Sequence, residues 1–158
     1  MIDRGKHNLL GVQIDAVDYD AAVGRIITAA REGVPCATSA LAVHGVMTGV
    51  LDNAHRYRLN QLDLIVPDGQ PVRWALNLLH RTRLADRVYG PSLMLKTCER
   101  AAAEQIPVFL FGGTSDLLSR LQTNLLEQFP NLQIAGMRAS MFRQLTPAER
   151  DDLVREIK

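Results

Sequence analysis

The sequence predicts an α/β fold with a mostly parallel sheet flanked by helices. Two observations predict it. Short apolar segments typical of strands alternate along the chain with longer amphipathic segments typical of helices, a pattern that joins parallel strands through right-handed helical crossovers. The composition is also that of an ordinary globular protein, with 47% hydrophobic and 22% charged residues in 158. At this length we expect a single domain over residues 1–158.

The first half of the chain is expected to contain two clear strands. Residues 9–15 alternate, with Leu10, Val12 and Ile14 on one side, which is the period of a strand. Residues 62–66 form a short apolar run that a Pro-Asp-Gly turn stops, as in a buried strand. The other expected elements here are a helix at 20–32, a short strand at 36–39, and helices at 41–51, 55–61 and 70–80.

The second half continues the alternation. The expected elements are a helix at 92–105, a strand at 107–111, a helix at 115–129, a strand at 132–136 and a helix from Thr146 onward. The last of these begins with a capping box, because Thr146 is followed by Pro147 and, three positions on, by Glu149.

Charge and cysteine content exclude several functional classes. The formal net charge of +1 argues against a general nucleic-acid binder. Two cysteines are too few for a disulfide framework, so a reducing compartment is expected. No apolar run reaches the roughly 20 residues of a spanning helix, and no signal peptide is visible, so we expect a cytoplasmic protein. The histidines and cysteines show no metal-ligand spacing.

Ligands of parallel α/β sheets bind beyond the carboxyl ends of the strands, which selects the loops at 38–39, 67–69, 112–114 and 136–138. Asp68 is the most informative residue among them. It follows a buried strand and lies between Pro67 and Gly69 in a sharp turn, where a general base could stand. The alternative is that Asp68 caps the helix that follows.

Three further groups could bind an anionic ligand. Gly112 and Gly113 connect a strand to a helix and could admit a phosphate, or could form only a tight turn. His44 lies in a helical segment near the 38–39 loop, where it could act on a ligand or simply pack or remain solvated. A basic loop could pair with a diphosphate or remain solvated; it contains Arg81, Arg83 and Arg87.

Four blocks of sequence, taken in order, resemble the WecG/TagA/CpsF family of glycosyltransferases. They cover residues 10–15, 60–69, 87–93 and 108–113, and the block that ends in Val66-Pro67-Asp68-Gly69 is the most specific. The resemblance implies a Rossmann-like core. It also implies an inverting reaction without a metal cofactor, in which a sugar passes from a UDP-sugar to a polyprenyl-diphosphate-linked saccharide. Such products feed bacterial surface polysaccharides.

The resemblance also implies roles for single residues. Asp68 falls on the family's general base and Arg87 on its functional arginine. Gly69, Gly112 and Gly113 would line the donor site. The family's Thr-x-Asn motif has a counterpart in Thr38, but no asparagine matches, and His44 could substitute for it.

The resemblance stops short of the family's C-terminal part, so we expect a truncated form. That part would reach the inner face of the membrane, where the full-length enzyme would be peripheral. The alternative function is a non-catalytic nucleotide-sugar-binding or assembly module. A nicotinamide dehydrogenase has little support, because the glycine fingerprint is absent. A shortened sheet would expose an edge, so a homo-oligomer is expected.

Overall fold

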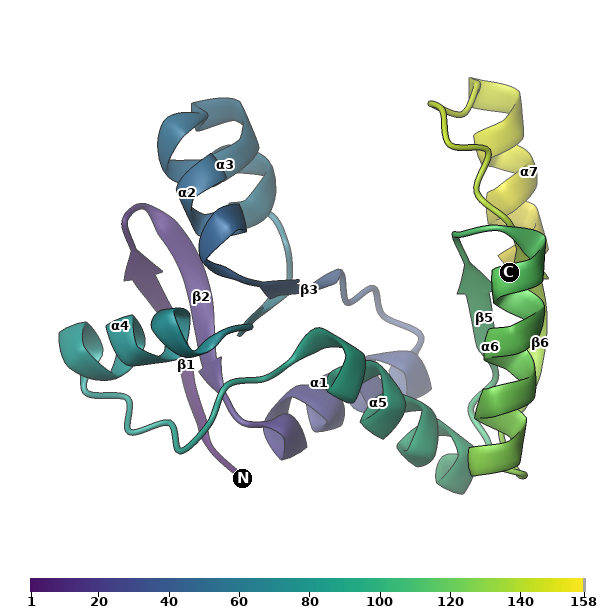
Figure 1. Ribbon diagram of the computed structural model, residues 1–158, viewed down its shortest axis with the longest axis horizontal. Helices are drawn as coiled ribbons and strands as arrows, with labels where there is room; N and C mark the ends of the chain where they lie inside the picture. The colour runs from purple at the N-terminus through teal and green to yellow at the C-terminus, as the bar shows by residue number, and fades with distance from the viewer. Residues whose placement is uncertain (158) are drawn as a thin grey trace. The chain divides into compact units, whose positions relative to one another are not determined.

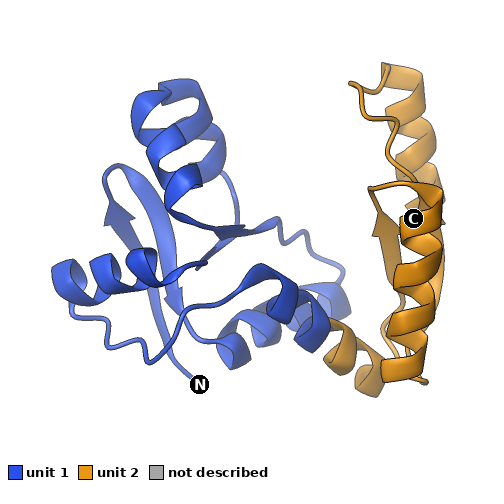
Figure 2. Ribbon diagram, in the orientation of Figure 1, with its two compact units in different colours: residues 1–97 blue, residues 98–158 orange. Residues whose placement is uncertain are grey.

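The computed structural model describes residues 1–157, and the chain divides into two compact units, residues 1–97 and 98–158 (Figure 2). Each unit contains short strands flanked by helices, so the predicted α/β class, consistent with a Rossmann-like core, is confirmed (Figure 1). The expectation of one domain over the whole chain stays a prediction. Among the described residues, no helix combines the length and apolar character that a membrane span needs.

The first unit opens with an antiparallel hairpin that the sequence analysis did not predict. Strand β1 (Asp3–Leu9) pairs with β2 (Val12–Val17), and Leu10 and Gly11 form the turn with φ angles of 54° and 93°. The predicted strand at 9–15 is therefore wrong at its start, because Leu10 lies exposed in the turn. Strand β2 is buried along nearly its whole length.

A parallel pair of short strands forms the middle of this unit. Strand β3 (Thr38–Leu41) runs beside β4 (Leu64–Pro67), with Thr38 opposite Leu64 and Leu41 opposite Pro67. Helices precede, connect and follow the two strands: α1 (Tyr19–Glu32), α2 (Val43–Leu51), α3 (Asn53–Asn60), α4 (Gln70–His80) and the start of α5 (Gly90–Glu104).

The core of the first unit lies between the hairpin, the parallel pair and α4. Its buried side chains come from the end of β1, from β2, β3, β4, α2, α3 and α4, and from Leu84 in the loop after α4. Val72 and Leu76 are the buried side chains of α4, one helical turn apart on its inner face. This packing fixes the end of β4 relative to the start of α4.

The second unit repeats the arrangement on a smaller scale. Strand β5 (Val108–Phe111) pairs in parallel with β6 (Ile134–Arg138), and helix α6 (Ser115–Gln128) connects them. Helix α7 (Pro147–Ile157) follows. The predicted elements of this half are all present, although β6 begins and ends two residues later than expected. Residues 136–138, expected to form a loop, therefore lie in a strand.

Candidate functional site

The carboxyl ends of β3 and β4 form one edge of the first unit's parallel pair. Leu41 and Pro67 face each other at this edge, and the backbone N–H of Asp68 donates to the carbonyl of Leu41 at 3.1 Å. The two segments that leave the strands, residues 42–44 and 68–69, therefore start side by side. This is where the topology of a parallel sheet predicts a ligand site.

Asp68 does not cap the helix that follows it. The N-cap of α4 is Gly69, and no side chain there bonds to the helix. The Asp68 carboxylate instead accepts a hydrogen bond from the backbone N–H of Gly90, the first residue of α5, at 3.3 Å. One Asp68 oxygen is held by this contact, and no hydrogen bond of the other oxygen is seen within the described residues.

Gly90 packs closely against Ala40 of β3 and lies near the Asp68 carboxylate. A Cβ atom at Gly90 would lie 3.1 Å from the Cβ of Ala40 and 3.7 Å from an Asp68 carboxylate oxygen. Glycine thus lets the start of α5 approach both β3 and the Asp68 carboxylate.

Arg87 is held beside the end of β4. The backbone N–H of Val88 donates to the carbonyl of Pro67 at 2.9 Å, so residues 87–89 run next to the Asp68 turn. The Arg87 guanidinium lies over the ring of Tyr89, 4.9 Å from its centroid. The backbone N–H of Tyr89 donates to the Tyr19 hydroxyl at 2.8 Å. The backbone of residues 87–89 thus lies beside the Asp68 turn, and a substrate-binding role for Arg87 stays a prediction.

Three helices start at this edge, and none of them has an acidic residue in its first turn. The N-caps of α2 and α4, Ala42 and Gly69, give no side-chain hydrogen bond, so backbone N–H groups of these first turns remain available. His44 lies exposed in the first turn of α2. Free amides and the helix dipoles together favour an anion at this edge.

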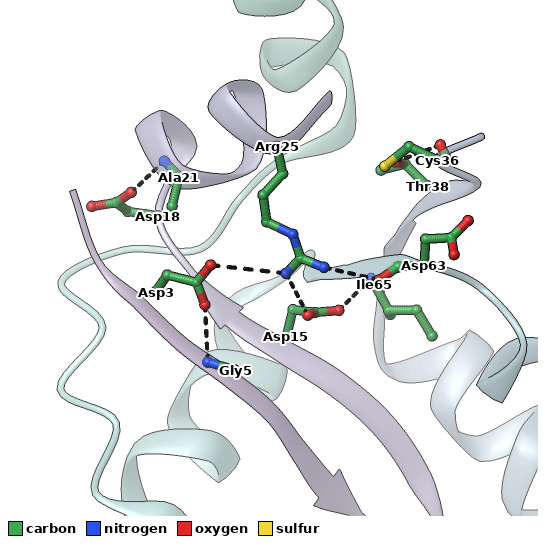
Figure 3. A network of polar contacts seen from close by, with 10 residues as sticks. All are labelled: Asp3, Gly5, Asp15, Asp18, Ala21, Arg25, Cys36, Thr38, Asp63 and Ile65. Atoms are coloured by element: carbon green, nitrogen blue, oxygen red, sulfur yellow. Dashed lines mark hydrogen bonds and ion pairs between the residues drawn. The ribbon is translucent and has the colours of Figure 1, made fainter. Parts of the chain in front are cut away.

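Thr38 lies at the other end of the strands. It is the first residue of β3 and faces Leu64, so it stands four residues, roughly 13 Å, from Asp68 along the sheet. Its hydroxyl donates to the carbonyl of Cys36 at 3.2 Å (Figure 3). The structure does not bring Thr38 to the Asp68 edge.

Gly112 and Gly113 belong to the second unit, between β5 and α6. The N–H of Gly112 donates to the carbonyl of Arg138, and the carbonyl of Gly113 accepts from Ser140. Both glycines have positive φ, 123° and 61°, and Thr114 caps α6. These contacts fit the tight-turn alternative, and a donor-binding role for the two glycines stays a prediction.

The sequence analysis missed an ion pair between a buried carboxylate, Asp15, and the partly exposed Arg25. Asp15 in β2 is only 1% exposed, and its carboxylate accepts from Arg25 Nη1 at 2.7 Å and from the backbone N–H of Ile65 at 2.8 Å (Figure 3). Arg25 also donates to the carbonyl of Asp63 at 3.0 Å. Asp15 therefore joins β2 to β4, the strand that carries Asp68. The strand alternation had suggested an outward-facing Asp15.

One pocket of about 500 Å³ lies near this ion pair. Residues of β1, α1 and the segment before β3 line it, among them Asp3, Arg25 and Cys36. Within residues 1–157, no group of three or more histidine, cysteine, aspartate or glutamate side chains is placed to hold a metal ion.

Comparison with known protein families matches residues 7–158 to the glycosyl transferase WecG/TagA/CpsF family. The chain belongs to this family. It is therefore a member of a glycosyltransferase family, as its sequence motifs indicated. In this WecG/TagA/CpsF chain, the most specific motif forms the end of β4 and the Asp68 turn, and the block at 87–93 forms the segment that packs beside it.

Proposed function

We propose that this WecG/TagA/CpsF chain transfers a sugar from a UDP-sugar to a polyprenyl-diphosphate-linked saccharide, with inversion and with Asp68 as the general base. The observation that carries the proposal is the Asp68 carboxylate at an edge where three helices begin without acidic first turns. A base and an anion-binding surface are the two parts that such a transfer needs.

The proposed step is a direct displacement. The acceptor hydroxyl gives its proton to Asp68, and its oxygen forms a bond to the anomeric carbon of the donor sugar. The bond between that carbon and the diphosphate oxygen breaks, and UDP leaves with the electron pair. The Gly90 amide fixes one Asp68 oxygen, which leaves the other to take the proton.

The leaving group carries the charge that the protein must stabilise. The amides at the starts of α2 and α4 and the guanidinium of Arg87 supply donors and positive charge for a diphosphate. Gly69 has a φ of 93°, a conformation that favours glycine, and it turns the chain from Asp68 into α4. In this proposal His44, exposed in the first turn of α2, contacts the donor. The proposed step does not use Thr38.

The acceptor sets the proposed location. A polyprenyl diphosphate remains in the lipid bilayer, so we place the enzyme at the cytoplasmic face of the inner membrane as a peripheral protein. The proposed chemistry assigns no step to a metal ion.

The test is Asp68→Asn. Loss of the base should lower the turnover of sugar transfer by roughly 10²- to 10⁴-fold. UDP binding, measured by isothermal titration calorimetry, should stay nearly unchanged, because the amide has the same shape and retains an acceptor for Gly90. The matched control is Asp20→Asn, an exposed carboxylate at the start of α1, which should leave turnover unchanged.

Undiminished turnover in Asp68→Asn would remove Asp68 from the mechanism. UDP binding by the unaltered chain with no transfer to a lipid-linked acceptor would instead favour the non-catalytic binding module.

A further inference from the structure

Helix α4 carries apolar residues on its outer face as well as toward the core. Its four exposed residues are all apolar, and three of them are large: Trp74 is 57% exposed, Leu78 82% and Leu79 60%. The fourth is Pro71. An ordinary surface helix also directs apolar residues toward the core, but it exposes polar residues to water.

The polar side chains of α4 are instead engaged by the protein. Arg73 donates to the carbonyls of Leu84 and Ala85, both at 3.0 Å. His80 Nε2 lies 2.7 Å from the carbonyl of Asn8. Asn77 makes hydrogen bonds to Thr82 and to the backbone of Leu84. These contacts fix the rotation of the helix, so Trp74, Leu78 and Leu79 cannot turn inward without breaking them.

Two arginines border this apolar face. Arg81 ends α4 and Arg83 follows in the loop, and both side chains are exposed while Thr82 and Leu84 between and after them are buried. Both arginines have left-handed backbone angles, with φ of 54° and 57°. That conformation is uncommon for residues other than glycine, asparagine and aspartate. The anchored Thr82 hydroxyl holds it here.

We propose that the outer face of α4, formed by Trp74, Leu78, Leu79, Arg81 and Arg83, docks on the surface of an anionic lipid bilayer. Large apolar side chains with a tryptophan, bordered by arginines, are typical of helices that lie in the membrane interface. An anionic lipid headgroup complements Arg81 and Arg83. The chain from Gln70 to Ala85 contains no acidic residue that could pair with these arginines from a second copy of α4. Asp86, which follows, already accepts hydrogen bonds from Gln70 and from the Arg87 amide. The charge pattern therefore favours lipid.

The inference deepens the proposed membrane location but rests on α4 alone. Vesicle binding is measured without sugar transfer, so its failure would leave the Asp68 chemistry in place. Conversely, a failure of the Asp68→Asn test would leave vesicle binding unaffected.

The chain contains its own probe, because Trp74 is its single tryptophan. We expect its fluorescence to shift to shorter wavelength when the 158-residue chain is mixed with vesicles of phosphatidylcholine and phosphatidylglycerol. Lipids with brominated acyl chains should quench it. Vesicles of phosphatidylcholine alone should give a weaker effect, and added salt should weaken binding to the anionic vesicles.

Two sets of variants test the two parts of the surface. Leu78→Gln and Leu79→Gln should each weaken partitioning into the anionic vesicles roughly tenfold or more. Arg81→Gln and Arg83→Gln should each weaken it about fivefold. The matched controls are Leu51→Gln, an equally exposed leucine at the end of α2, and Arg58→Gln, an exposed arginine on α3, which should bind as the unaltered chain does.

Two results would overturn the proposal. The first is an unchanged Trp74 spectrum with anionic vesicles. The second is a shift that grows with protein concentration in the absence of lipid and resists bromolipid quenching, which would assign the face to a second copy of this chain. Equal losses in the α4 variants and the controls would also count against it.

Discussion

Asp15 shows how a single carboxylate connects the core to the site. Its two oxygens hold Arg25 from α1 and the amide of Ile65 from β4, so one side chain joins three elements. Burial lowers the pKa of Arg25, but the hydrogen bond and charge of Asp15 outweigh it, and the pKa is raised overall. Removal of the Asp15 carboxylate takes one acceptor from Arg25 and the acceptor of the Ile65 amide.

Asp15→Ala should lower the free energy of unfolding by about 2 kcal/mol, because the Ile65 amide loses its acceptor in the core. Chemical denaturation followed by circular dichroism measures it. The matched control is Asp20→Ala on the exposed start of α1, with an expected change of a few tenths of a kcal/mol. Equal effects of the two substitutions would show that the Asp15 pair adds nothing to stability.

Helix α7 begins with the capping box that its sequence predicts. Glu149 accepts hydrogen bonds from the Thr146 amide and hydroxyl, and Arg143 forms an ion pair with it at 2.6 Å. The bonds from Arg143 first, and from Thr146 next, lower the pKa of Glu149 to about 2, compared with an ordinary 4.5. A depressed carboxylate pKa favours the folded helix above the ordinary value, and this contribution disappears as pH falls from about 4.5 toward 2.

An NMR titration of the Glu149 carboxylate should therefore have its midpoint near pH 2. Arg143→Gln should move the midpoint upward, since it removes the main cause of the shift. A midpoint near 4.5 in the unaltered chain would show that the capping box does not form in solution.

The elements that the sequence failed to predict lack the usual local signals. Strand β1 is mostly polar and mostly exposed, so it has no apolar alternation, and its turn places a leucine where asparagine or aspartate commonly precedes glycine. The exposure of one face of α4 was not predicted either, because Trp74, Leu78 and Leu79 look like core residues until the rotation of the helix is known. By contrast, the Pro-Asp-Gly turn predicted that Asp68 lies between a strand and a helix, as it does, since proline and glycine mark turns by their backbone chemistry.

The two cysteines differ in burial, so their alkylation rates measure how well the folded molecule protects its interior. Cys98 is buried, and burial raises the pKa of its thiol, whereas Cys36 is only half-buried. Alkylation requires an accessible thiolate, so in the folded protein Cys98 should react roughly a hundredfold or more slowly than Cys36.

Mass spectrometry after timed exposure to N-ethylmaleimide measures both rates, and in denaturant the two cysteines should react alike. Comparable rates in the folded protein would show that the segment around Cys98 opens readily.

The division into two units also could not be predicted from the sequence, because the boundary at 97–98 falls inside helix α5 rather than in a linker.

The short turn after β4 limits the distance between Asp68 and the start of α4. Gly69 is the only residue between Asp68 and the first residue of α4. The two peptide units between the Cα atoms of Asp68 and Gln70 span at most about 8 Å, so the position of Asp68 relative to α4 is closely fixed. If α4 docks on lipid as proposed, the Asp68 carboxylate would stay at a fixed short distance above the headgroups, within reach of an acceptor sugar that a lipid chain holds there. In that arrangement, the single residue Gly69 would set the distance between the Asp68 carboxylate and the lipid surface.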